Sequence, residues 1–207
     1  QLPDDIAITL RPKESFSSLE QLLFNPYQWL LRYSAKLQPS RIVSMGGDFR
    51  IFGNLAHGLV EQYFLHPSAL VMSEAEFDIW FAESFSVLVD QEGATLRSPG
   101  RGADLEGFRY RLHHSMCNLR DQVAKAGIVQ VLPEQGVAGQ FPGGELAGSA
   151  DLVMQNGRGE RAIVDMKWSG IKKFPDKLKR NRHLQLAIYA ELLRQETGEW
   201  PSVAYYV

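Results

Sequence analysis

The chain is organised around two short apolar runs, at 146–154 and 162–166, which flank a turn that begins with Asn-Gly. Asn-Gly between two such runs is a strong hairpin signal, although a four-residue connection weakens it. Charged residues interrupt the pattern: Asp151 lies inside the first run, and Asp165 and Lys167 end the second. Because strand side chains alternate between faces, Asp165 and Lys167 are expected on the same face. The pattern therefore predicts a buried hairpin that carries two carboxylates and an ammonium group.

Helical periodicity, capping residues and short apolar runs predict the other elements. Helices are expected after the capping-box sequence 17–20, from Pro26 with Asn25 as its cap, over 54–65, from the capping box 73–76 to about 90, over about 104–125 and over about 181–196. Strands are expected at 128–132, 136–141 and 203–207. Residues 1–14 are expected to be an extended lead-in, and the Gly-, Ser- and Pro-rich segment 91–107 a mobile surface loop.

Composition is that of an ordinary globular domain, with 207 residues, 44% hydrophobic and 22% charged. The formal net charge is −2, so nucleic-acid binding would require a local basic patch. The only cysteine, Cys117, excludes an internal disulfide and a cysteine-only metal site, and is typical of a reducing compartment. No apolar run approaches the roughly 18–20 residues that span a bilayer and no signal peptide is visible, so we expect a cytoplasmic protein without membrane contact. Because the chain starts at Gln1 and ends within the strand-like 203–207, we expect residues 1–207 to be a single domain cut from a longer protein.

Carboxylates on buried neighbouring strands are costly unless they are paired or bind a cation. Two close carboxylates repel, and without a partner one would tend to stay protonated. A divalent cation removes this problem, and Mg²⁺ prefers carboxylate, water and phosphate oxygens. We therefore predict a cation at Asp151 and Asp165, with Lys167 orienting a metal-bound water or neutralising charge on a phosphate. The simpler alternative is a buried Asp–Lys ion pair with Asp151 on a loop.

Other polar residues have both a structural and a functional interpretation. His57 and Glu61 share a helix face, and His57 becomes a metal ligand, with Glu61 orienting it, only if that helix lies over the acidic pair. Otherwise His57 is a surface histidine beside a carboxylate. Glu134 could approach the metal, but a solvated turn carboxylate is expected. Gln185 and Tyr189 share a face of a predicted helix, where Tyr189 can equally be a core aromatic.

A basic run follows the second apolar run. Its cations are Lys172, Lys173, Lys177, Lys179, Arg180 and Arg182, and its single acid is Asp176. Such runs usually form a solvated face. The position of this run just after Lys167 equally favours contact with the phosphate backbone of a nucleic acid.

Five motifs follow one another along the chain: Ser15-Phe-Ser-Ser-Leu with Pro26 downstream, Gly53-Asn-Leu-Ala-His57-Gly-Leu-Val-Glu61, Gly148-Ser-Ala-Asp151-Leu-Val, Ile163-Val-Asp165-Met-Lys167 and Gln185-Leu-Ala-Ile-Tyr189-Ala. In this order they resemble the RecB-like exonuclease branch of the PD-(D/E)xK nuclease superfamily. Each motif is weak alone, but five in order from about residue 15 to 207 are much more specific. The resemblance implies an α/β fold with a restriction-endonuclease-like core, which is a mixed central β-sheet flanked by helices.

The same resemblance implies a metal site, a catalytic lysine and a pair of residues on the DNA side. The implied residues are His57, Asp151, Asp165 and the main-chain carbonyl of Met166 as ligands of Mg²⁺ or Mn²⁺, Lys167 acting on the attacking water or the scissile phosphate, and Gln185 and Tyr189 lining the DNA side. The roles of His57, Gln185 and Tyr189 rest on the resemblance alone. DNA is the implied partner, and the resemblance also allows a helicase domain or subunit as a second partner.

The chain also departs from the family pattern. Iron–sulfur members carry a cysteine beside the proline of the first motif, where this chain has Asn25, so no iron–sulfur cluster is expected. A Thr-Gly pair commonly follows the catalytic lysine, whereas here Trp168-Ser169-Gly170 follows, and we expect the bulk of Trp168 to alter how DNA enters. The GxxxxGK[ST] signature of a helicase motor does not occur in this sequence, so any motor lies elsewhere.

The leading hypothesis is a Mg²⁺- or Mn²⁺-dependent DNA nuclease, an exonuclease by resemblance, that hydrolyses phosphodiester bonds in DNA repair and recombination. The second is a catalytically inactive nuclease fold that binds DNA or scaffolds a repair complex. A third is a metal hydrolase that acts on RNA or another phosphodiester.

Overall fold

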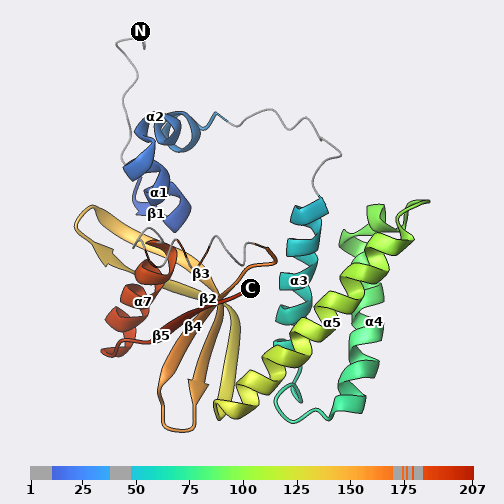
Figure 1. Ribbon diagram of the computed structural model, residues 1–207. Coiled ribbons are helices and arrows are strands. Elements are labelled where there is room, and N and C mark those ends of the chain that lie inside the picture. Colours follow the sequence, from blue (N-terminus) through green and yellow to red (C-terminus); the bar gives the residue numbers. More distant parts are fainter. Residues whose placement is uncertain (1–10, 38–47, 170–173, 175, 177–178, 180–183) are drawn as a thin grey trace.

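The computed structural model describes residues 11–37, 48–169, 174, 176, 179 and 184–207, and a five-stranded mixed sheet lies at its centre (Figure 1). The strands are β1 (Lys13–Glu14), β2 (Ile128–Phe141), β3 (Gly144–Asn156), β4 (Arg161–Met166) and β5 (Ser202–Tyr206). β3 pairs antiparallel with β2 and β4, whereas β1 and β5 join β3 and β4, respectively, in parallel.

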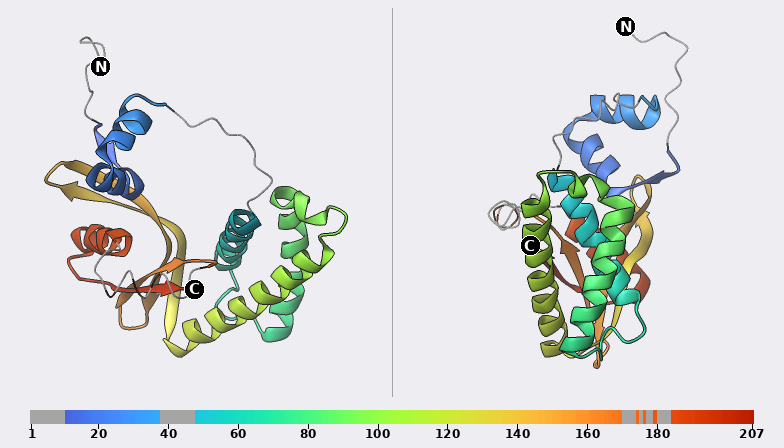
Figure 2. Two further views of the ribbon diagram at one scale, coloured as in Figure 1. Left: turned by 45° about the horizontal axis from the view of Figure 1, so that its top comes forward. Right: turned by 90° about the vertical axis from the view of Figure 1, so that its right-hand side faces the viewer.

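Helices cover both faces of the sheet (Figure 2). They are α1 (Phe16–Phe24), α2 (Pro26–Trp29) with the π-helical turn η1 (Leu30–Ser34), α3 (Asp48–Leu65), α4 (Glu74–Glu92) with the 3₁₀ turn η2 (Ala94–Arg97), α5 (Gly102–Lys125) and α7 (Leu184–Thr197). α3, α4 and α5 form the larger core with one face, and α7 and α1 form a smaller core with the other. The expected α/β architecture, a mixed sheet flanked by helices, is therefore confirmed. Among the described residues, no helix combines the length and apolar character needed to cross a lipid bilayer.

One edge of β3 is incompletely paired. β2 pairs with the first edge over 144–156. The second edge is shared, since β4 pairs with it over 152–155 and β1 over 145–146. No described strand pairs with this edge between those two stretches, over 147–151. This gap lies in the middle of the sheet, and Asp151 is its last residue.

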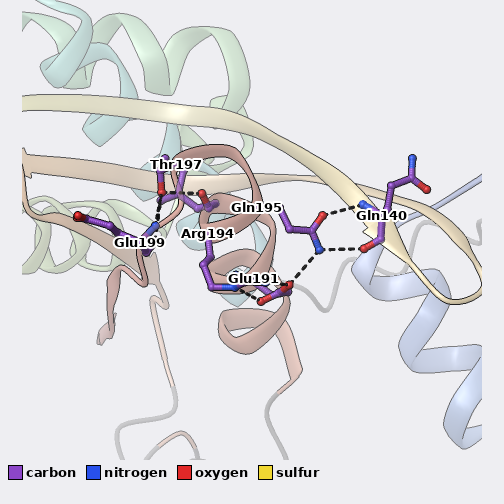
Figure 3. Close-up of polar contacts among 7 residues, drawn as sticks. Gln140, Glu191, Arg194, Gln195, Thr197 and Glu199 are labelled. Atoms are coloured by element: carbon purple, nitrogen blue, oxygen red, sulfur yellow. Dashed lines mark hydrogen bonds and ion pairs between the residues drawn. The ribbon is translucent and has the colours of Figure 1, made fainter.

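α7 is fastened to β2 by the side chain of Gln195 (Figure 3). Its Oε1 accepts the main-chain N–H of Gln140 at 2.9 Å, and its Nε2 donates to the carbonyl of the same residue at 2.9 Å. A Cβ at Gly139 would lie 2.4 Å from this Oε1, so glycine lets the amide group reach the strand. Gln195 also donates to Glu191, which pairs with Arg194 one turn along the helix. These contacts fix the rotation of α7, which carries the predicted site residues Gln185 and Tyr189.

α5 is joined to α3 and α4 through Arg120. Its Nε donates to the hydroxyl of Tyr63 at 2.9 Å, and its guanidinium lies 4.3 Å from the ring centroid of Phe77. A cation over an aromatic ring adds about 0.5–2 kcal/mol to the burial of the ring itself. Since Tyr63 lies on α3 and Phe77 on α4, the three helices form one layer whose position sets that of His57.

Three predicted boundaries differ from the structure. The first helix is capped by Ser15 and not Ser17, because Ser15 and Ser18 exchange hydrogen bonds as a capping box. The strands expected at 128–132 and 136–141 are one strand, β2. The segment 91–107, expected to be a loop, contains η2 and the start of α5, because Leu96 is fully buried and anchors it. The mobility expected of this segment stays a prediction.

We predict that Phe77→Ala lowers the free energy of unfolding by about 3–5 kcal/mol, because the fully buried ring contacts Tyr63, Trp80 and Phe81. Urea denaturation followed by circular dichroism measures this loss. The matched control is Ile79→Ala on the same helix, where 63% of the side chain is exposed and a change within about 0.5 kcal/mol is expected. Equal losses for the two variants would contradict the assignment of Phe77 to the core.

Candidate metal centre

Asp151 lies where the ladder between β3 and β4 stops. The last paired residues are Leu152 and Val164. Beyond them, the main-chain N–H of Met166 donates to Asp151 Oδ2 at 2.7 Å. A side-chain carboxylate thus takes the place of the main-chain acceptor that a continuing ladder would supply. This bond holds the Asp151 carboxylate in the gap, next to the last residues of β4.

Glu134 of β2 stands opposite Asp151, where both strands lose their regular alternation. The register pairs the residues on either side of these two acids but not the acids themselves. Leu152 packs in the core beneath α3, whereas Ala150, two residues away, packs in the core beneath α7. Glu134 has φ +46°, which is uncommon outside glycine and incompatible with a regular strand. The irregularity therefore occurs at the point where the carboxylates of the two strands come together.

His57 reaches the same place from α3. Its Nδ1 lies 3.7 Å from Asp151 Oδ2, and its Nε2 lies 3.1 Å from the carbonyl oxygen of Met166. Leu55 and Leu59 on the buried side of α3 are almost fully covered, so the helix has a fixed orientation over the sheet. His57 therefore lies beside Asp151, one member of the acidic pair that its predicted role requires, and that role stays a prediction.

Glu134 completes a cluster that sequence reasoning interpreted differently. One ligand atom from each of His57, Glu134 and Asp151 lies within 4.8 Å of the other two, and within the described residues this is the group with such spacing. The hydroxyl of Ser149 donates to Glu134 Oε2 at 2.8 Å and orients it. Glu134 is exposed, as expected of a solvated carboxylate, but it lies within β2 and not in a turn. Counting the hairpin register back from its turn would have placed Glu134 opposite Asp151.

The donor set fits a hard divalent cation. Two carboxylates and one imidazole supply oxygen and nitrogen ligands close together, and the Met166 carbonyl lies beside the same imidazole. His57, Glu134, Asp151 and this carbonyl are the groups that would hold the ion. A cation there would also relieve the repulsion between the two carboxylates.

Asp165 lies beside Lys167, and its predicted role as a metal ligand stays a prediction. Its carboxylate is 1% exposed and pairs with the ammonium group of Lys167. The two side chains share a face, as predicted from strand alternation. The Asp–Lys pair of the simpler alternative is therefore present, but the loop that it assumed for Asp151 is wrong, because Asp151 lies in β3. Asp165 is not part of the His57–Glu134–Asp151 cluster.

Burial raises the pKa of the Asp151 carboxyl above its ordinary value, and the charge of Glu134 adds to the rise. The His57 imidazole, the Met166 N–H and the Lys167 ammonium oppose it but do not cancel it. The carboxylate is thus held in a position where its charge is incompletely compensated by the protein. A cation bound there would favour the ionised form.

Gln185 and Tyr189 lie on the other side of the acids, beneath the sheet. Gln185 hydrogen-bonds the Tyr189 side chain, and burial, with Asp151, Asp165 and Glu134 nearby, raises the pKa of the Tyr189 hydroxyl. A Cβ at Gly148 would lie 2.8 Å from the Tyr189 ring, so glycine is needed for this contact. Because Tyr189 is only 6% exposed, the structure makes it part of the smaller core.

The basic run falls mainly outside the described residues. Lys179 is described and exposed. The other predicted phosphate contacts, Lys172, Lys173, Lys177, Arg180 and Arg182, lie outside the described residues. Their role stays a prediction.

A comparison with protein families gives a match to the model described as the PD-(D/E)XK nuclease superfamily, over residues 13–207. The matched range begins at β1 and includes every element that contributes to the metal centre. No curated protein matches the chain.

We predict that Asp151→Asn raises the melting temperature of the metal-free protein at pH 7. The folded-state pKa of Asp151 is raised, so its contribution to stability is present at low pH and is lost as pH rises through that pKa. Asparagine keeps an acceptor for Met166 N–H and removes the charge. A rise of a few degrees is expected, at about 2–4 °C per kcal/mol for a chain of this size.

Differential scanning calorimetry with and without Mn²⁺ provides the second half of this test. The metal should raise the melting temperature of the wild type and leave that of Asp151→Asn nearly unchanged. The control is Asp121→Asn, at an exposed position on α5, which should behave as wild type. A variant less stable than the wild type at pH 7 would show that charge on Asp151 is compensated without metal.

Glu134→Gln should weaken Mn²⁺ binding at least about tenfold, because it removes one of the two carboxylates of the cluster. Isothermal titration calorimetry measures the change. Glu145→Gln is the matched control on the same hairpin, where the carboxylate accepts a bond from Gln140 away from the cluster. Unchanged binding in Glu134→Gln would restore the interpretation of Glu134 as a solvated carboxylate.

Proposed function

Because the chain belongs to the PD-(D/E)XK nuclease superfamily, whose members hydrolyse phosphodiester bonds with divalent metal ions, we propose that it is a RecB-like DNA exonuclease. The observation that carries the proposal is the convergence of His57, Glu134 and Asp151 at the gap in β3. A role in DNA repair and recombination, with a helicase domain or subunit as partner, is part of the same proposal. So is a cytoplasmic location, which suits the single free cysteine, Cys117.

His57, Glu134, Asp151 and the Met166 carbonyl would hold Mg²⁺ or Mn²⁺ in this proposal. Such an ion, when bound, polarises a phosphate and lowers the pKa of a bound water. The resemblance also implies Asp165 as a ligand, and in the structure its carboxylate orients Lys167. In this proposal the protein supplies the metal ligands in fixed positions and holds the ammonium group of Lys167 beside them.

Lys167 is the group we assign to the reacting phosphate. Its side chain is 23% exposed, and its ammonium group pairs with Asp165 and lies 6.0 Å from the ring centroid of Phe174. An ammonium group fixed in this way can position the attacking water or neutralise charge that develops on the phosphate oxygens.

Tyr189 and Gln185 support the acids in this proposal. The buried Tyr189 ring lies against Gly148, and its hydroxyl is near all three carboxylates, so it fixes the β3 backbone beside the site. Lys179 and the other cations of the 172–182 run are assigned to the DNA backbone. Binding through them would weaken as salt increases, since each phosphate contact releases counterions.

The test is degradation of labelled linear and circular DNA, single- and double-stranded, with Mg²⁺ or Mn²⁺. We expect the wild type to degrade linear DNA and to spare circles, and Lys167→Ala and Asp165→Ala to lose about 100-fold or more in rate. Lys125→Ala, at the exposed end of α5, is the matched control and should keep full activity.

Three results would count against parts of this proposal. Equal degradation by the wild type, Lys167→Ala and Asp165→Ala would remove the assigned roles. Cleavage of circles would replace the exonuclease with an endonuclease, and faster cleavage of RNA in the same assay would change the substrate. DNA binding that is the same in wild type and Asp165→Ala, without cleavage at any metal concentration, would favour the inactive scaffold.

A further inference from the structure

A cavity of about 370 Å³ opens beside the metal centre, between α3, α5 and the ends of β4 and β5. Its volume lies within the range of small-molecule sites, about 300–1,000 Å³. Apolar side chains such as Val60, Met116 and Leu119 form most of its wall. The function assigned above uses none of these three apolar residues, so the apolar part of the cavity needs its own explanation.

The cavity and the metal centre share residues. His57, Met166 and Lys167 belong to both. An occupant of the cavity would therefore touch the residues that surround the proposed scissile phosphate. Because the two sites share these residues, one molecule could contact both.

Aromatic side chains from three elements line the cavity and are already held in place. Phe52 of α3 stacks on Phe108 at 4.6 Å between ring centroids, and Trp168 meets the edge of the same ring at 4.9 Å. Tyr206 donates its hydroxyl hydrogen to the carbonyl of Ser115. Since these contacts exist without an occupant, the cavity requires little rearrangement to accept a flat ring.

Two cationic side chains, Lys167 and the exposed Arg111 of α5, are among the described residues that line the cavity. A mainly apolar wall with these two cations matches a molecule that has a flat apolar part and an anionic part. A purely aliphatic ligand would make no use of this charge distribution.

We propose that this cavity takes an unstacked nucleobase of the strand whose phosphate lies at the metal centre. This inference rests on the proposed nuclease function and specifies its substrate. A base can stack on aromatic side chains whatever its identity, so the pocket would be tolerant of sequence. A base inside a duplex must first leave its stack, so the protein would act on single strands and frayed ends in preference to closed duplex.

The test is to fill the cavity with a larger side chain at a lining position where a substitution should not prevent folding. Ser115 lines the cavity, and its contact with Tyr206 uses only its main-chain carbonyl. Leucine favours a helix more than serine does, so Ser115→Leu should fold and place a larger side chain in the cavity. Asn118→Leu, at an exposed position three residues further along α5 and outside the cavity lining, is the matched control.

Binding is measured by fluorescence anisotropy in EDTA, where no cleavage occurs, with a labelled single-stranded oligonucleotide and the same oligonucleotide carrying abasic nucleotides. The wild type and Asn118→Leu should bind the normal strand about tenfold more tightly than the abasic strand. Ser115→Leu should bind the two strands equally, because filling the cavity and removing the base delete the same contact.

The opposite results are equally clear. The base pocket would be overturned if abasic nucleotides weakened DNA binding by Ser115→Leu as much as binding by the wild type, or if they weakened binding by neither protein. Absence of binding to any strand would overturn it as well. Cleavage with Mn²⁺ is then measured on the same strands. Activity without any dependence on the base would remove the pocket and leave the nuclease. Base-dependent binding without cleavage would remove the nuclease and leave the pocket.

Discussion

The hydrogen bond from Met166 N–H to the Asp151 carboxylate is the contact on which the site depends. It occurs at the point where β4 separates from β3, so it joins two strands that main-chain pairing no longer connects. The carbonyl of the same residue, in the next peptide group, faces His57. One main-chain segment thus orients both an acidic and a basic side chain. The positions of the Asp151 and His57 side chains are therefore set by the way in which β4 separates from β3.

That arrangement is stabilised from both faces of the sheet. The three-helix layer fixes His57 through contacts far from it, such as those of Arg120 with Tyr63 and Phe77. On the other face, Tyr189 packs against Gly148, close to the acids. Between these two layers, burial keeps the pKa of the Asp151 carboxyl above its ordinary value.

The sequence predicted a large part of this from local patterns. The hairpin around 156–159 and the shared face of Asp165 and Lys167 follow from strand periodicity. Five ordered motifs indicated the PD-(D/E)XK superfamily, and the RecB-like branch within it stays a prediction. Glu134 was expected to be a solvated turn carboxylate. It is exposed, but it lies in β2 opposite Asp151, which only the register counted back from the hairpin turn would have indicated. The Asp165–Lys167 pairing and the cavity beside α5 depend on side chains from several distant segments. Such long-range packing has no signature in a single stretch of sequence.

The bond between Gln195 and Gln140 has a consequence for self-association. β2 pairs with β3 on one side only, within the described residues, so its outer rim would offer free N–H and C=O groups to a strand from another molecule. The amide of Gln195 occupies both groups of one residue on that rim, and the α7 helix that carries it stands in the way of an approaching chain. A feature that orients a helix thereby also guards the sheet against edge-to-edge polymerisation.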